Sequence, residues 1–123
     1  MPEQPDTLAA TRLLVADALA FADFDAAEEP PPGEPRVVDT PVTSVRDVGT
    51  GLWQIEAGTA TDVEVDEVFL VLAGWGSLAF EDGSTVELRP GVLVRLHEGD
   101  RTTWVIEEPL RKLYLAWPQS DGG

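Results

Sequence analysis

Glu67 is the residue in this sequence whose position best suits chemistry. It begins the segment Glu67–Gly74, in which every residue between the two ends is apolar. Because side chains alternate between the two faces of a strand, Glu67 shares one face with Val65 and Phe69. A carboxylate on an apolar face costs free energy unless it is paired, metal-bound or protonated. The sequence therefore predicts that Glu67 points into the interior, as the acid of a small-molecule pocket.

Two other interpretations of Glu67 remain open. Its carboxylate reaches water if the strand starts at the edge of the fold, and it forms a structural ion pair if a cation faces it. Arg95, Arg111 and Lys112 are the cations considered for that pair. Only the pocket interpretation gives Glu67 a part in ligand binding or proton transfer.

Trp53 and Trp104 are the aromatic residues predicted to form the walls of this pocket. Each belongs to a short apolar segment, and Trp53 shares its strand face with Ile55. Ligand pockets are mostly apolar with a few polar groups, which suits these residue types. The alternative is that both tryptophans fill core volume. The predicted pocket residues are Trp53, Ile55, Glu67, Phe69 and Trp104.

The remaining ionisable candidates are predicted to have structural or solvated positions. Asp62, Glu64 and Asp66 alternate along one strand face, but hard cations are usually held by loops that gather more oxygen atoms. A solvated acidic face is therefore the expectation. His97 is the one histidine of the chain and stands before Glu98 and Gly99, so a surface turn is expected for it.

Composition excludes several classes of function. The net charge is −15 and the isoelectric point about 4.1, so the surface repels nucleic-acid phosphates and anionic membranes. No apolar run is long enough to cross a bilayer. Cysteine is absent, which rules out disulfides and thiolate chemistry and fits a reducing, cytoplasmic location. Small molecules and protein partners remain as binding partners.

The segments that contain these residues are predicted to be strands and turns. Short apolar runs end at Asp-Gly and Pro-Gly pairs, which is typical of hairpins and of antiparallel sandwiches or barrels. The chain is 123 residues long, which suits one core. The predicted strands are 37–38, 42–48, 52–57, 61–72, 77–80, 85–88, 92–96, 102–106 and 113–117.

The first 32 residues are predicted to form an irregular N-terminal arm. Residues 8–19 allow either a short helix or, over 13–15, a strand, and the spacing of their apolar side chains does not decide between them. Phe21 and Phe24 are expected to cover one edge of the core. Consecutive prolines at 30–32 predict an extended connection to the barrel domain, assigned to 33–118. Residues 119–123 are expected to be a disordered tail.

Two segments carry a resemblance to a known family. Glu67–Gly74 resembles the end of the first cupin motif, in which a glutamate precedes an apolar strand and a glycine turn. Gly83, Leu88, the Pro90 and Gly91 pair, and Gly99 resemble the second motif. The resemblance implies a cupin-type antiparallel jelly-roll barrel, all β in class, often dimeric, with a pocket between its sheets.

Three further segments resemble the ureidoglycine-aminohydrolase branch of the cupins: 51–58, Thr103 with Trp104, and 111–114. In metal-dependent cupins two histidines precede the glutamate of the first motif. Here 60–63 contains none, and a third histidine would fall near Thr102. Asp62 and Glu67 could then bind a divalent metal only weakly, through oxygen. Tight sites for zinc, iron or nickel normally need imidazole or thiolate ligands. No tightly held cofactor is therefore predicted.

Lys112 and Tyr114 receive two conflicting predictions. Packing considerations favour Leu113, Leu115 and Trp117 as the core-facing side of the last strand, which turns Lys112 and Tyr114 outward. In cupins this strand can instead face the pocket, which implies a polar cluster with Glu67. Such a cluster binds a carboxylate or carbonyl group and moves a proton.

The sequence thus predicts a homodimeric cupin that binds a small molecule in its barrel and lacks the histidine metal site. The candidate catalytic residues are Glu67, Lys112 and Tyr114. A hydrolase or isomerase that works through Glu67 with Asp62 or Lys112 is the second possibility. A non-catalytic interaction protein with a solid barrel is the third. The dimer is expected because Val68, Leu70 and Leu72 need covering.

Overall fold

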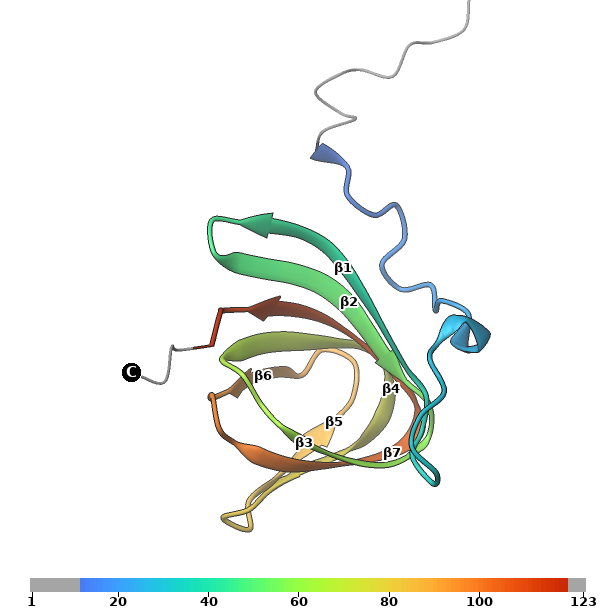
Figure 1. Ribbon diagram of the computed structural model, residues 1–123, viewed down its shortest axis with the longest axis vertical. Helices are drawn as coiled ribbons and strands as arrows, with labels where there is room; N and C mark the ends of the chain where they lie inside the picture. Colours follow the sequence, from blue (N-terminus) through green and yellow to red (C-terminus); the bar gives the residue numbers. More distant parts are fainter. Residues whose placement is uncertain (1–11, 120–123) are drawn as a thin grey trace, which may run out of the picture.

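The computed structural model describes residues 12–119, and these form an all-β barrel preceded by an arm (Figure 1). One short 3-10 helix, η1 (Phe24–Ala26), lies in the arm. The strands are β1 (Val37–Val45), β2 (Val48–Ile55), β3 (Gly58–Val63), β4 (Glu67–Phe80), β5 (Thr85–Leu88), β6 (Leu93–Leu96) and β7 (Arg101–Ala116). The predicted all-β jelly-roll architecture is confirmed.

Two long strands organise the barrel. β4 and β7 pair with each other in antiparallel register along nearly their whole length. Each also pairs with two shorter strands, since β4 contacts β6 and then β5, and β7 contacts β3 and then β2. β1 continues the sheet beyond β2. One strongly bent sheet therefore encloses the interior, as Figure 1 shows.

The strand boundaries differ from the predicted ones at the bends. The predicted strand 61–72 is in fact two strands, because β3 ends at Val63 and β4 begins at Glu67. Conversely, 77–80 belongs to β4, and the two predicted strands on either side of Pro109 are one strand, β7. Register shifts between β4 and β7 fall at 71–76, opposite this proline. Proline is tolerated at such bulges because no ladder hydrogen bond is required of it.

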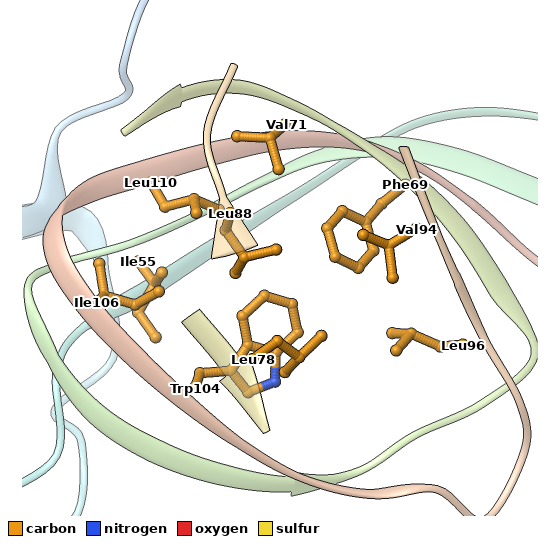
Figure 2. Packing of buried hydrophobic residues seen from close by; sticks show 10 residues of the cluster. All are labelled: Ile55, Phe69, Val71, Leu78, Leu88, Val94, Leu96, Trp104, Ile106 and Leu110. Carbon is orange, nitrogen blue, oxygen red and sulfur yellow. The ribbon is translucent and has the colours of Figure 1, made fainter. Parts of the chain in front are cut away.

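The core fills the space that the strands enclose. Figure 2 shows ten buried apolar side chains pointing into this space, and Phe69, Leu78, Leu88, Leu96 and Leu110 have no measurable exposure. Phe69 comes from β4, Leu88 from β5, Leu96 from β6 and Leu110 from β7. Alternate residues of these strands supply the core, as expected for a sheet with one covered face.

The arm is irregular, and two buried side chains of the barrel hold it. Arg12 is helical, but residues 13–19 form neither a helix nor a strand. The helix prediction is therefore wrong over 13–19, and the strand prediction is wrong over 13–15. Residues 8–11 lie outside the described residues, as do 1–7 and 120–123. Gln54 donates to the backbone carbonyl of Ala22 and accepts from its N–H, both at 2.8 Å. Arg111 donates to the carbonyl of Ala18 at 2.6 Å and to Gln54 at 2.7 Å. Polar side chains therefore fasten the arm.

Phe21 and Phe24 do not cover the core. Their rings contact each other, with centroids 6.2 Å apart, and Phe21 remains 41% exposed. Neither belongs to the buried core cluster.

Replacing Gln54 by alanine is expected to release the arm. The change removes both hydrogen bonds to Ala22 and leaves the buried Arg111 guanidinium with one partner fewer. The free energy of unfolding should fall by about 1–3 kcal/mol, as for other buried polar groups that lose a partner. Urea unfolding and limited proteolysis of the arm measure the two effects. Gln54→Glu keeps the acceptor for Arg111 and should lose less; arm cleavage unchanged in the alanine variant would contradict the assignment.

Candidate functional site

Glu67 and Lys112 form a buried ion pair in the barrel. Glu67 Oε2 lies 2.7 Å from Lys112 Nζ, and the two side chains are 11% and 6% exposed. Glu67 begins β4, and Lys112 lies on β7 opposite Val71, so both project from neighbouring strands toward the interior. The structure thus shows the interior position predicted for Glu67 together with the ion pair that was its alternative. Each charge offsets the desolvation cost of the other.

Three aromatic rings surround the Lys112 ammonium. Its Nζ lies 4.3 Å from the ring centroid of Phe69, 4.6 Å from that of Trp53 and 4.8 Å from that of Trp104. The rings also contact one another, since Trp104 lies 5.3 Å from Trp53 and 5.5 Å from Phe69 between centroids. Aromatic faces attract cations, so this cage stabilises the charge that Glu67 pairs with. We call Lys112, Glu67 and these three rings the caged ion pair.

The prediction that Lys112 points outward is wrong. Counted over whole residues, Lys112 is 4% exposed, whereas Leu113 and Leu115 are 38% and 41% exposed. The packing argument assumed that the more apolar face must be the inner one. It fails because Glu67 and the aromatic rings make the inner face favourable for one ammonium group, while the leucines lie on the outer face.

Tyr114 shares the inner face of β7 but has a different partner. Its hydroxyl donates to Asp39 Oδ1 at 2.8 Å, which links β7 to β1 across β2. Burial, followed by this hydrogen bond and the nearby Asp39 charge, raises the pKa of Tyr114 above its usual value. The phenol is therefore held as a neutral donor. The structure brings Glu67 and Lys112 into direct contact and leaves Tyr114 bound to Asp39.

Glu64 is a buried acid that the sequence pattern did not identify. It is 6% exposed, and its Oε2 accepts from Thr102 Oγ1 at 2.6 Å and from Trp104 Nε1 at 3.1 Å. The predicted solvated face is wrong here because β3 ends at Val63 and strand alternation stops with it. No glycine or proline marks this break in the sequence. Glu64 fixes the indole that also contacts Lys112.

Burial raises the pKa of Glu64, and two hydrogen bonds from Thr102 and Trp104 oppose that shift. A carboxyl with a raised pKa binds more protons in the folded than in the unfolded state. Its contribution to stability is therefore present at low pH and is lost as pH rises from the unfolded value of 4.5 through the folded pKa. Glu64→Gln should raise the free energy of unfolding at neutral pH and flatten this part of the pH profile. Thermal unfolding across pH, with the exposed Glu87→Gln as control, measures it.

The other acidic candidates do not converge on a metal site. Asp62 accepts from the backbone of Val63, and Asp66 accepts from Glu98 N–H at 3.0 Å and from Arg95 at 3.2 Å. The Glu98 hydrogen bond, above all, lowers the pKa of Asp66. Within residues 12–119 no three His, Cys, Asp or Glu side chains are arranged to hold a metal ion. At Glu67, the cupin position for a metal ligand, the ammonium of Lys112 takes the place of a cation, so the donors present do not fit a metal.

His97 lies in the turn between β6 and β7, as expected. Its side chain is 65% exposed, and its Nδ1 lies 3.9 Å from Asp100. Asp100 Oδ2 accepts from the His97 backbone N–H at 2.8 Å, which closes the turn. The histidine is far more exposed than the caged ion pair, and its contacts with Asp100 are those of a surface turn.

A cavity of about 400 Å³ adjoins the aromatic cage. It lies between the proline-rich connection and the barrel, and we call it the mouth cavity. Three of the predicted pocket residues line it, namely Trp53, Ile55 and Trp104. The other two, Glu67 and Phe69, are not among its lining residues and belong to the caged ion pair. The remaining lining residues are Glu28, Glu29, Pro30, Pro31, Glu34, Pro35, Val37, Ala60, Thr61 and Asp62.

The bent antiparallel barrel with an inward glutamate at the start of β4 is typical of a cupin domain. The model of the EutQ-like cupin domain matches residues 44–114, and the chain belongs to this family. The aminohydrolase branch predicted from the sequence remains a prediction. No curated protein matches the chain. No helix of residues 12–119 has the length and apolar character needed to cross a membrane.

Solved structures share the fold. The Clostridium difficile EutQ protein has a TM-score of 0.68 at 16% identity, over 80% of this chain and 81% of that one. A protein of unknown function from Rhizobium leguminosarum has a TM-score of 0.61 at 23% identity, over 97% of this chain and all (100%) of that one. Ectoine synthase from P. lautus has a TM-score of 0.60 at 16% identity, over 76% and 70%. At these identities the likeness concerns the fold alone.

Proposed function

We propose that this EutQ-like cupin binds a small organic molecule in the mouth cavity without the help of a tightly held metal. The observation that carries the proposal is the wall of a cavity of about 400 Å³. The half-buried Trp53 forms this wall with the 3% exposed Trp104 behind it, and their ring centroids lie 5.3 Å apart. That volume is within the range of small-molecule sites, and aromatic walls with polar groups at the edge are typical of them.

The caged ion pair supports this wall from within. Lys112 Nζ contacts both indoles, and Glu64 accepts from the Trp104 N–H, so the rings are held from two sides. Because the indoles are already held in place, ligand binding loses less side-chain conformational entropy. We therefore assign Glu67, Lys112 and Glu64 as positioning residues. Their polar atoms are engaged with one another or with the wall, which favours binding over catalysis as the function of this site.

A small-molecule screen tests the proposal. A library with neutral, anionic and cationic members is measured by thermal shift and by quenching of tryptophan fluorescence. At least one member should bind saturably, and Trp53→Leu should weaken its binding at least tenfold. The matched control is Trp75→Leu, because Trp75 is 47% exposed on the β4 bulge and does not line the cavity. Absence of any saturable ligand, or an equal loss in both variants, would remove the proposal.

We also propose that a second copy of the chain covers the outer face of the sheet. Leu93, Leu70 and Leu113 are register neighbours across β6, β4 and β7. Leu93 and Leu113 are 67% and 38% exposed, so an apolar band crosses three strands. Contiguous apolar surface of this kind is typical of protein interfaces. A dimer formed through one patch on both copies would bury the band.

Leu93→Glu is expected to convert the dimer into a monomer, because each interface would then bury two unpaired carboxylates related by symmetry. Light scattering coupled to size-exclusion chromatography measures the mass. Val63→Glu, at a 54% exposed apolar residue of β3, is the control and should leave the dimer intact. A wild-type monomer at micromolar concentration would disprove the dimer.

A further inference from the structure

The mouth cavity has two kinds of lining that together indicate the class of its ligand. One side is the aromatic wall of Trp53 and Trp104, and four carboxylates, those of Glu28, Glu29, Glu34 and Asp62, belong to residues around it. We propose that the cavity takes an organic cation, with an alkylammonium or quaternary ammonium group against the half-buried indole of Trp53, because Trp104 beside it is only 3% exposed. This inference rests on the proposed function, since it names the ligand class of the same cavity.

The indole faces are suited to a cation. Tryptophan gives the strongest attraction between an aromatic ring and a cation, and recognition of quaternary ammonium groups uses such walls. Lys112 Nζ lies 4.6 and 4.8 Å from the centroids of Trp53 and Trp104, so these rings already accommodate one ammonium group on the buried side. Glu67 neutralises that ammonium at 2.7 Å. The caged ion pair therefore presents no net positive charge that would repel a second cation in the cavity.

The charge around the cavity disfavours an anionic ligand. Among the lining residues, all of which lie in the described part of the chain, none is lysine, arginine or histidine. Arg36 adjoins the lining residue Pro35, but its guanidinium is paired with Asp25 at 3.0 Å. Lys112 is buried and bound to Glu67, so it offers no site for a carboxylate or phosphate. An anion would face the four carboxylates without a compensating charge, whereas a cation would be attracted to all of them.

The aromatic wall and the carboxylates come from distant parts of the sequence. Glu28, Glu29 and Glu34 belong to the proline-rich connection, whereas the tryptophans belong to β2 and β7. Consecutive prolines at 30–32 stiffen the connection that carries these glutamates. The glutamates therefore meet the aromatic wall without ordering of a flexible loop, which favours affinity for a small ligand.

Three probes of the same shape and different charge test the inference. They are choline, its neutral carbon isostere dimethylbutanol and the anion dimethylbutyrate. Calorimetric and fluorescence titrations on the whole chain, at physiological ionic strength, should show saturable binding of choline. The neutral isostere and the anion should bind at least tenfold more weakly, because they lack the attraction to the carboxylates and the rings.

Two triple variants with the same change of net charge distinguish specific binding in the cavity from non-specific attraction of cations to an acidic protein. The first changes the cavity glutamates to glutamine, and the second changes three exposed glutamates outside the cavity lining. The substitutions are Glu28→Gln, Glu29→Gln and Glu34→Gln in the first, and Glu87→Gln, Glu107→Gln and Glu108→Gln in the second. Both raise the net charge by the same amount. Choline affinity should fall at least tenfold in the first and stay within twofold of the wild type in the second.

Each other outcome overturns the inference in a distinct way. If the isostere or the anion binds as tightly as choline and Trp53→Leu abolishes that binding, the cavity is a binding site but its ligand is not a cation. If both triple variants lose affinity equally, choline is only a counterion of an acidic surface. If no probe binds while only neutral or anionic library members bind through Trp53, the cation inference fails and the proposed function stands. If nothing in the library binds, the cation inference and the proposed function both fail.

Discussion

Lys112→Met is expected to lower the free energy of unfolding by about 3–5 kcal/mol, the cost typical of removing one partner from a buried ion pair. Methionine has nearly the length of lysine, so the cage of Trp53, Phe69 and Trp104 stays filled and the change is mainly one of charge. The Glu67 side chain, 11% exposed, is left largely buried without the cation that pairs with it. Urea unfolding monitored by tryptophan fluorescence measures the loss.

The double variant Glu67→Gln with Lys112→Met is the decisive control. Removing both charges eliminates the unpaired carboxylate, so most of the lost stability should return. The two single variants and the double variant form a thermodynamic cycle that isolates the pair. The single Lys112→Met variant, in contrast, leaves the Glu67 carboxylate inside the barrel without its cation. A loss below about 1 kcal/mol in that variant would show that Glu67 reaches solvent.

The cycle also bears on the function. If the double variant is stable and still binds the ligand found in the screen, the caged ion pair is needed only to keep the barrel interior neutral. If it is stable but binds at least tenfold more weakly, the ammonium holds the two indoles in the arrangement that the cavity requires. Either result separates the positioning of the wall from overall stability.

Gly74→Ala is the second substitution with a large expected effect. Gly74 has a φ of 95°, in a region that favours glycine, and it lies at the bulge of β4. A Cβ at this position would overlap the backbone carbonyl of Pro109 and lie 2.5 Å from Leu110 Cα. Backbone atoms cannot move aside as a flexible side chain does. We expect a loss of about 2–5 kcal/mol, the sum of backbone strain and overpacking.

Gly83→Ala isolates the two contributions to this loss. Gly83 has a φ of 91°, almost the same conformation, but a Cβ there would meet no atom within 4 Å. The control should lose about 1 kcal/mol, which is the cost of the left-handed conformation alone. Thermal and urea unfolding of both variants give the difference. Equal losses at Gly74 and Gly83 would mean that β4 and β7 can separate at the bulge without cost.

The bulge at Gly74 matters for the site as well as for stability. It lies between the half of β4 that carries Glu67 and Phe69 and the half that pairs with β5. β7 crosses the same bend at Pro109, just before Arg111 and Lys112. A shift of this crossing would therefore move Lys112 relative to Glu67, so Gly74→Ala should also weaken ligand binding in the variant that remains folded.

Sequence reasoning succeeded where local pattern and physical cost agree. Alternation with Phe69 predicted the inward direction of Glu67, because a strand of this length cannot turn its side chains without a bulge. Spacing of turn pairs predicted the all-β class for the same local reason. The pattern failed for Glu64, since nothing local shows that β3 ends at Val63.

The sequence by itself determined the all-β class and favoured an inward Glu67, because both depend on strand periodicity and turn chemistry. The role of Trp53 and Trp104 as pocket walls stays a prediction. Only the tertiary structure decided which face of β7 is buried, since Lys112 is favourable inside only when Glu67, the rings of Trp53 and Phe69 from two other strands, and Trp104 of β7 surround it. It also decided that the glutamates of the connection lie at the same cavity as Trp53 and Trp104. Such contacts join residues far apart in the chain, and the free energy that selects them comes from the partners rather than from the local pattern.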